Sequence, residues 1–196
     1  MSAVQKLEPI SVEDYLAGEL ISPLKHEYVD GVVYAMSGAT NAHNDIAGNV
    51  YHFLRGRLSG GPCRPYNSDT KLRLFEAGKR FYYPDVTVTC RPNPPTDVFQ
   101  DHPAAVFEVL SRKTRRIDQG EKKTAYLAKS SVLVYALVET ESPAVVVHRR
   151  VGDEFVREAY EGLTAVLPLP EFNAELPFAE IYENIRFAVE RDEPRV

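Results

Sequence analysis

Two stretches of strand-forming residues, each holding one acidic side chain, constrain the fold of this chain more than any other feature. Residues 81–90 and 104–110 are rich in aromatic and β-branched residues, and loop residues bound each of them. Asp85 lies in the first stretch and Glu108 in the second. Because a carboxylate in a central strand is expensive to remove from water, each acid needs a cation, a hydrogen-bond donor or a metal ion beside it. Two such acids on neighbouring strands predict a site for a divalent metal ion.

The segments around these strands predict an α/β fold. A helical segment at 118–129 separates the strand of Glu108 from residues 131–138, which are nearly all apolar, as in a strand buried on both faces. A strand, a helix and a second strand in this order form a crossover with parallel pairing. Asp30-Gly31 between two apolar runs predicts a β-hairpin near the N-terminus. We therefore expect an α/β fold in which helices flank a mixed β-sheet, with an N-terminal hairpin.

Local signals predict three further elements. The spacing of apolar residues predicts a helix over 41–58. A shorter helix is expected to begin after Ser11, which heads a capping-box pattern, and to end near Gly18. Residues 69–75 alternate between apolar and polar side chains, which predicts a strand with Lys71 on a solvent-exposed face.

Composition indicates one globular domain. The chain has 196 residues, of which 44% are hydrophobic and 26% charged. We expect a single domain over 1–196, with its core at about 10–185 and a charged tail at 187–196. Residues 1–10 lack the apolar core of a signal peptide, and no apolar run approaches the roughly 18 residues that cross a bilayer. The expected location is therefore the cytoplasm, away from the membrane.

Several classes of protein lack support in this sequence. Cys63 and Cys90 have no metal-binding spacing and, in a cytoplasmic protein, are expected to be reduced thiols. The net charge of -5 argues against a surface that binds nucleic acid everywhere. No GxSxG elbow, Walker loop or GxGxxG motif is present, so neither a serine hydrolase nor a protein with an organic cofactor is expected.

Lys122 is the best candidate for a positive group beside the two acids. Asp118, Lys122 and Tyr126 are spaced four residues apart and so share one face of the predicted helix. That face can look back toward the sheet and its acids. The alternative is that Lys122 lies on a solvated helix face, because Lys123 follows it.

A basic turn directly follows the strand of Glu108. Its positive charge would attract a phosphate backbone, although a solvated loop explains such a cluster equally well. The four basic residues are Arg112, Lys113, Arg115 and Arg116.

Other acidic and histidine residues have both structural and functional interpretations. Asp85 alone can be a strand-end acid bonded to backbone amides, and Glu108 can form a structural salt bridge. Glu27 opens the predicted hairpin, where an exposed cross-strand pair competes with a role in the site. For His43, at the start of the second predicted helix, a structural role is favoured over that of a general base.

Several different motifs, spread over most of 10–185, together resemble those of a known family. They are YPDV at 83–86, FEVLS at 107–111, TRRIDQGEK at 114–122 and EYVDGVVY at 27–34. Together they resemble the Uma-two family, a group of restriction-endonuclease-like proteins within the PD-(D/E)XK nuclease superfamily. Each motif is weak alone, and their order and spacing carry the resemblance.

The resemblance implies a single endonuclease-like domain with a restriction-endonuclease-like fold, and metal-dependent hydrolysis of phosphodiester bonds. Asp85 and Glu108 would be ligands of Mg²⁺ or Mn²⁺, with the Val109 carbonyl as a third. The superfamily usually has lysine two residues after the glutamate, where this chain has Leu110. The resembling family takes its lysine from the following helix, which again indicates Lys122.

The resemblance also implies a partner and a substrate. Glu27 would add a further carboxylate, DNA would be the substrate, and a homodimer would cut both strands. The main alternative is a catalytically inactive nuclease-fold module that binds nucleic acid or a protein partner, which the displaced lysine and the acidic net charge favour. A phosphodiesterase acting on RNA or a nucleotide is a second alternative that the sequence does not separate from the first hypothesis.

Overall fold

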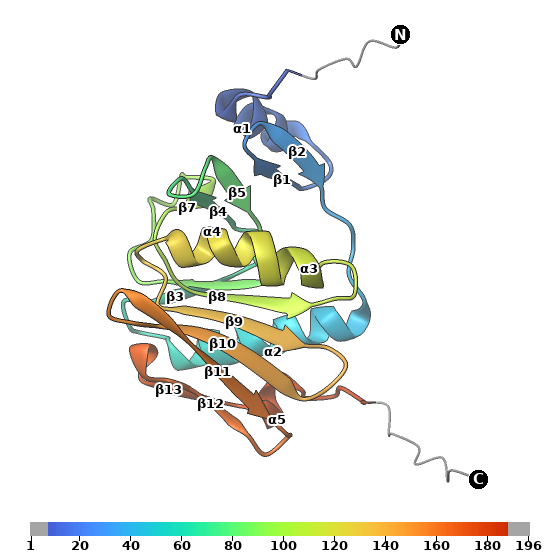
Figure 1. The fold of residues 1–196 in the computed structure, drawn as a ribbon, viewed down its shortest axis with the longest axis vertical. Coiled ribbons are helices and arrows are strands. Elements are labelled where there is room, and N and C mark those ends of the chain that lie inside the picture. Colours follow the sequence, from blue (N-terminus) through green and yellow to red (C-terminus); the bar gives the residue numbers. More distant parts are fainter. Residues whose placement is uncertain (1–7, 188–196) are drawn as a thin grey trace, which may run out of the picture.

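The structure is a computed structural model that describes residues 8–187 (Figure 1). The predicted tail at 187–196 lies outside the described residues except for its first position. No helix within 8–187 has both the length and the apolar character needed to cross a membrane. In chain order the elements are α1 (Val12–Ile21), β1 (His26–Val29), β2 (Val32–Ala35), α2 (Asn41–Arg57), β3 (Arg64–Asn67), β4 (Lys71–Leu74), β5 (Arg80–Tyr82), β6 (Val86–Thr89), β7 (Phe99–Gln100), β8 (Pro103–Leu110), α3 (Arg115–Ile117), η1 (Asp118–Lys122), α4 (Lys123–Ala128), β9 (Val134–Glu139), β10 (Ala144–Val151), β11 (Glu154–Glu161), β12 (Val166–Leu169), η2 (Pro170–Phe172), β13 (Ala174–Pro177) and α5 (Phe178–Ile181).

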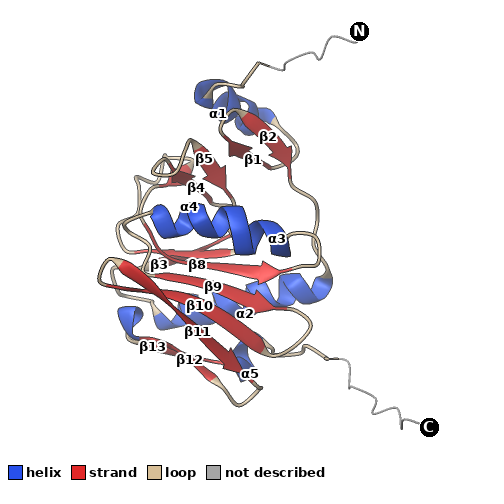
Figure 2. Ribbon diagram, viewed as in Figure 1, coloured by secondary structure: helices blue, strands red, loops and turns tan. Residues whose placement is uncertain are grey.

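The larger sheet contains the strand of Glu108. Its six strands lie in the order β11-β10-β9-β8-β6-β3. β8 and β9 are parallel, with Ala105 opposite Val134, which confirms the predicted crossover. α3 and α4 lie over one face of this sheet and α2 lies over the other (Figures 1 and 2). The α/β class and the flanking helices are therefore as predicted.

A second sheet has the strand order β2-β1-β5-β4-β7, so the chain forms two main sheets where one was expected. The predicted hairpin turns at Asp30 and Gly31, which have φ values of 48° and 96°. The prediction of one strand over 81–90 is wrong, because the chain divides at Pro84 into β5 of the second sheet and β6 of the larger sheet. Proline cannot donate to a β-ladder and restricts the residue before it. This break places Asp85 at the junction of the two sheets.

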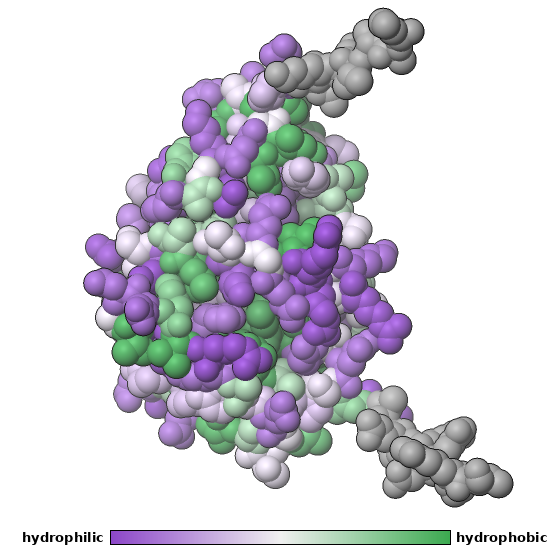
Figure 3. All heavy atoms as spheres, viewed as in Figure 1, coloured by the Kyte–Doolittle hydropathy of each residue, from purple (hydrophilic) through white to green (hydrophobic). Residues whose placement is uncertain are grey.

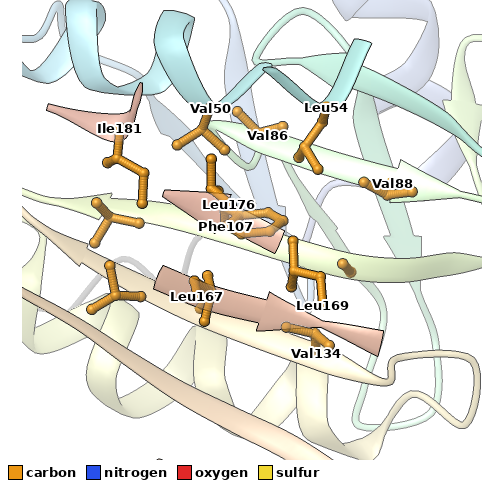
Figure 4. Close-up of a cluster of buried hydrophobic side chains, with 14 of the residues drawn as sticks. Val50, Leu54, Val86, Val88, Phe107, Val134, Leu167, Leu169, Leu176 and Ile181 are labelled. Atoms are coloured by element: carbon orange, nitrogen blue, oxygen red, sulfur yellow. The ribbon is translucent and has the colours of Figure 1, made fainter. Parts of the chain in front are cut away.

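The predicted apolar face of α2 is buried in the main core. Ile46, Val50 and Leu54 are fully buried against the larger sheet, where Phe107 of β8 meets them (Figure 4). Strands β12 and β13 and helix α5 close the same core. This packing fixes the first turn of α2 next to the ends of β6 and β8.

A smaller apolar cluster fills the space between α4 and the two sheets. Tyr126 of α4 packs against Tyr82 of β5 and Tyr135 of β9, with ring centroids 5.8 and 5.2 Å away. Leu110 of β8 is buried in the same cluster. Helix α4, which belongs to the predicted crossover, therefore packs against strands of both sheets.

Helix α1 begins where predicted and runs further. The Ser11 hydroxyl accepts the Asp14 N–H at 3.0 Å, as expected of a helix cap. The predicted end at Gly18 is wrong, since the helix continues to Ile21. Glycine lowers the stability of a helix by only about 1 kcal/mol, and Tyr15, buried against the second sheet, helps to anchor α1.

The prediction that Lys71 faces solvent is also wrong. Lys71 is only 5% exposed, and its Nζ lies 5.3 Å from the centre of the Tyr15 ring and 5.5 Å from that of the Tyr83 ring. An ammonium group is attracted to an aromatic face at this range. The alternating pattern identified the two faces of β4 correctly, but it contained no signal that α1 would cover the polar one.

Cys63 and Cys90 form a disulfide, so the expectation of two reduced thiols is wrong. Strands β3 and β6 pair Arg64 with Thr89 in an antiparallel register. The next positions outward in that register are the two cysteines. Their pairing therefore follows from how two strands align, which cysteine spacing alone does not reveal.

Reduction of this bond should lower the free energy of unfolding by about 3 kcal/mol, because a cross-link over a sequence separation of 27 restricts the unfolded chain. Urea unfolding with and without dithiothreitol measures the difference. The double variant Cys63→Ser/Cys90→Ser is the control, since the reductant should not change its stability. Two titratable thiols in the denatured, unreduced protein would contradict the bond.

Candidate active site

Asp85 and Glu108 lie side by side where β6 meets β8. The antiparallel register pairs Val86 with Phe107, and the next pair in that register is formed by the two acids. Oδ2 of Asp85 accepts a hydrogen bond from the Val109 N–H at 2.7 Å. The structure thus brings together the two acids that the sequence pairs.

The Glu108 carboxylate lies between the sheets with only 4% of its side chain exposed. Its Oε1 accepts a hydrogen bond from the Tyr126 hydroxyl at 3.0 Å and one from the Lys122 ammonium at 3.3 Å. Burial raises the pKa of Glu108 well above its usual value, the charge of Lys122 opposes this, and nearby carboxylates raise the pKa further. The charged form of Glu108 therefore needs a positive group nearby.

Lys122 contacts three carboxylates at the centre of the site. Its Nζ lies 2.8 Å from Glu27, 3.3 Å from Glu108 and 3.8 Å from Asp118. Burial lowers the pKa of Lys122, but these carboxylates outweigh it and hold the pKa above the ordinary value. The side chain is 9% exposed, so the alternative of a solvated helix face is wrong.

The helix that carries Lys122 differs from the continuous α-helix expected over 118–129. Asp118–Lys122 form a π-helical turn, η1, between α3 and α4. The buried Tyr135 hydroxyl donates to the Asp118 carbonyl oxygen at 2.8 Å and so competes with the helix's own hydrogen bonds. Such turns are frequent at functional sites. Asp118, Lys122 and Tyr126 all remain buried, so the expected face does look toward the acids.

Glu27 joins the site from the second sheet. Besides its contact with Lys122, its Oε1 accepts the Tyr83 N–H at 3.3 Å. The alternative of an exposed cross-strand pair is therefore wrong. Because Glu27 lies on β1 and Lys122 on the helix over the larger sheet, this ion pair links the two sheets.

Three further residues belong to the site although the sequence did not single them out for it. Asp118 and Tyr126 share the helix face of Lys122, and this spacing was their available signal. His43, favoured as structural, places Nε2 3.3 Å from Oδ2 of Asp85. Burial lowers the pKa of His43, but the hydrogen bond to Asp85 and its charge outweigh burial and raise the pKa. Since this contact depends on how α2 packs, the sequence offered no direct signal for it.

Half of the predicted basic turn is neutralised by acids. Arg112 Nε lies 2.6 Å from Glu141, and Arg115 forms a two-pronged pair with Glu139 at 2.6 and 2.5 Å. The other two basic residues, Lys113 and Arg116, are exposed and have no ion pair with any residue in 8–187. Hydrophilic side chains gather on this part of the surface beside α3 (Figure 3). Within this turn, these two side chains have no carboxylate partner among residues 8–187 and so remain free to contact a phosphate.

The charge balance of the site fits a bound cation. Three carboxylates contact the Lys122 ammonium, and Asp85 lies beside one of them, Glu108. Repulsion among these acids raises the pKa of both Glu108 and Asp118 beyond the effect of burial, which Lys122 only partly offsets. No three His, Cys, Asp or Glu side chains within 8–187 already form a set of metal ligands. Magnesium usually keeps several waters and takes one or two protein carboxylates. Asp85 and Glu108 supply two carboxylates on paired strands, which is the number that magnesium usually takes.

Comparisons with known proteins identify a family and two relatives that this chain resembles in sequence. The family Uma2, described as "Putative restriction endonuclease", matches residues 12–179. "Uncharacterized protein slr1290" of Synechocystis sp. (strain ATCC 27184 / PCC 6803 / Kazusa) is 34% identical over 145 residues, which cover 74% of this chain and 76% of the relative. "Uncharacterized protein sll1609" of the same organism is 26% identical over 156 residues, covering 78% and 88%.

A solved structure shares the architecture. It is described as a "putative nuclease belonging to DUF820" from Anabaena variabilis ATCC 29413, with a TM-score of 0.70 and 16% sequence identity. The similarity covers 88% of this chain and 97% of that one. At this identity it shows the fold alone, and that fold is nuclease-like. With most of its length matched by the family and by a relative of 34% identity, the chain belongs to the Uma2 family.

Proposed function

We propose that this protein is a metal-dependent endonuclease that hydrolyses phosphodiester bonds in DNA. One observation carries the proposal: adjacent strands of a nuclease-like fold bring Asp85 and Glu108 together, and the Lys122 ammonium lies 3.3 Å from Glu108. Family membership supports the reaction class, and the excess of carboxylates supports a divalent cation.

Asp85, Glu108 and the Val109 carbonyl would hold Mg²⁺ or Mn²⁺. When bound, such an ion polarises a phosphodiester and lowers the pKa of a water molecule so that it can attack phosphorus. Asp85, the more exposed of the two acids, would meet the ion from the solvent side. The buried Glu108 would be oriented by the Tyr126 hydroxyl, which already bonds its Oε1.

Lys122 would take the part of the superfamily's usual lysine. Leu110, at that position, is 1% exposed within an apolar cluster and has no polar group to offer. The Lys122 ammonium approaches Glu108 from the helix instead, and Glu27 holds it at 2.8 Å. Its charge would orient the attacking water or stabilise the negative charge that develops on the phosphate.

Exposed Lys113 and Arg116 would contact the DNA backbone beside the site. Because one such site cuts one strand, cleavage of a duplex would use a symmetric homodimer.

The experiment is calorimetric titration of Mn²⁺ into the wild type and Glu108→Gln, followed by incubation with supercoiled plasmid. The wild type should bind Mn²⁺ and nick the plasmid, EDTA should stop the nicking, and the variant should lose both properties. Glu158→Gln is the matched control, since Glu158 is an ion-paired acid on β11, at the far edge of the same sheet. It should bind and cut like the wild type.

Three results would contradict the proposal in different ways. Plasmid bound without metal, with affinity falling as salt rises and with no cleavage, would favour the inactive nucleic-acid-binding module. Cleavage of an RNA substrate but not of plasmid would replace DNA as the substrate. Nicking that persists in Glu108→Gln would remove the catalytic assignment of these acids.

A further inference from the structure

The His43 side chain is held in place beside Asp85 by the core. Thr40 caps α2, and its hydroxyl oxygen accepts the His43 N–H at 3.3 Å. Ile46 and Val50, in the following turns of the helix, are fully buried. The imidazole therefore projects from a fixed helix turn toward the ends of β6 and β8, where its Nε2 lies 3.3 Å from Oδ2 of Asp85.

The surroundings of the ring determine which nitrogen carries hydrogen. Nδ1 is buried and has no hydrogen-bond partner within the described part of the chain. In the neutral and in the charged ring alike, hydrogen on Nε2 faces the Asp85 carboxylate at 3.3 Å. The neutral form with hydrogen on Nδ1 alone would place a lone pair against a carboxylate oxygen and bury an unpaired N–H, which is more costly. Nε2 is therefore the donor to Asp85.

The two oxygens of the Asp85 carboxylate have different surroundings. Oδ2 accepts the Val109 N–H at 2.7 Å and lies 3.3 Å from Nε2 of His43. No hydrogen bond from residues 8–187 reaches Oδ1. The carboxylate is thus held by one oxygen and open at the other.

We propose that His43 is a positioning residue that fixes Asp85 so that Oδ1 faces the metal ion of the proposed site. The inference rests on the proposed function, because it assigns a role within that same site. Partners that orient a metal ligand typically change metal affinity by about 10- to 100-fold when removed. His43 itself does not contact the ion.

Two substitutions separate hydrogen bonding from packing. His43→Gln keeps an N–H donor of similar reach, and His43→Leu keeps similar bulk without a donor. Titration of Mn²⁺ by calorimetry should show affinity reduced by about 10- to 100-fold in His43→Leu and close to the wild type in His43→Gln. His52→Leu is the control, because His52 is an exposed histidine on the same helix. Thermal melts of all variants establish that they are folded.

Pulsed electron paramagnetic resonance of the Mn²⁺-loaded wild type gives a readout that does not depend on activity. We expect no coupling to an imidazole nitrogen, and such a coupling would overturn the inference by making His43 a ligand. An equal loss of Mn²⁺ affinity in His43→Gln and His43→Leu, or no loss in either, would overturn the role of His43 but leave the proposed function standing. Absence of Mn²⁺ binding by the wild type would overturn the proposed metal site as well.

Discussion

Replacing Lys122 with methionine is expected to lower the free energy of unfolding by about 3–5 kcal/mol at neutral pH. The methionine would fill a similar volume but leave Glu27, Glu108 and Asp118 in a buried space without their shared cation. Urea denaturation in the presence of EDTA measures this change without any contribution from metal binding. Lys123→Met is the matched control, since Lys123 is the next residue and is more exposed, and it should stay close to the wild type.

The double variant Lys122→Met/Glu108→Gln tests the cause of this loss. Removing the Glu108 charge should restore part of the stability, because an unpaired buried carboxylate is costlier than a neutral amide. A double variant that is less stable than Lys122→Met would show that lost packing, and not unpaired charge, explains the effect. Neither variant should cleave DNA.

Asp85→Asn is expected to reduce cleavage by about 10³-fold or more, which corresponds to about 4 kcal/mol in the activation barrier. The substitution removes the charge of a proposed metal ligand and keeps an oxygen that can accept the Val109 N–H. Binding of Mn²⁺ should weaken in parallel. Single-turnover cleavage with saturating protein and calorimetry measure the two effects.

The same substitution should leave the metal-free fold intact. The charge of Asp85 raises the pKa of both Glu108 and Asp118, so its removal relieves repulsion among buried acids. We therefore expect the free energy of unfolding in EDTA to fall by no more than about 1 kcal/mol, the range of an ordinary partly exposed substitution. Asp85→Asn protein that stays folded and still cuts DNA would contradict the role of Asp85.

The sequence predicted the parts of the site that depend on short-range periodicity. Two strands with a loop between them were enough to bring Asp85 next to Glu108, and four-residue spacing was enough to turn Lys122 toward them. Pro84 also carried a usable signal, because proline inside a strand pattern marks an interruption. That signal identifies the boundary between the two sheets, although the sequence was interpreted as one strand.

Other features depend on contacts between distant segments. The π-helical turn is bonded by the Tyr135 hydroxyl of a later strand, and the burial of Lys71 requires α1 to cover β4. The contact between His43 and Asp85 requires the packing of α2 against the larger sheet. No local pattern in the sequence contains these distances, because tertiary packing sets each of them.

The ion pair between Glu27 and Lys122 has a consequence for the synthesis of the protein. The two residues lie on different sheets and are far apart in the chain, so they meet only after both sheets have formed and docked. Contacts of such long range form late, and N-terminal segments leave the ribosome first. A partly synthesised chain therefore lacks the arrangement proposed to cut nucleic acid. The proposed active site would therefore form only after the chain beyond Lys122 has left the ribosome and the two sheets have docked.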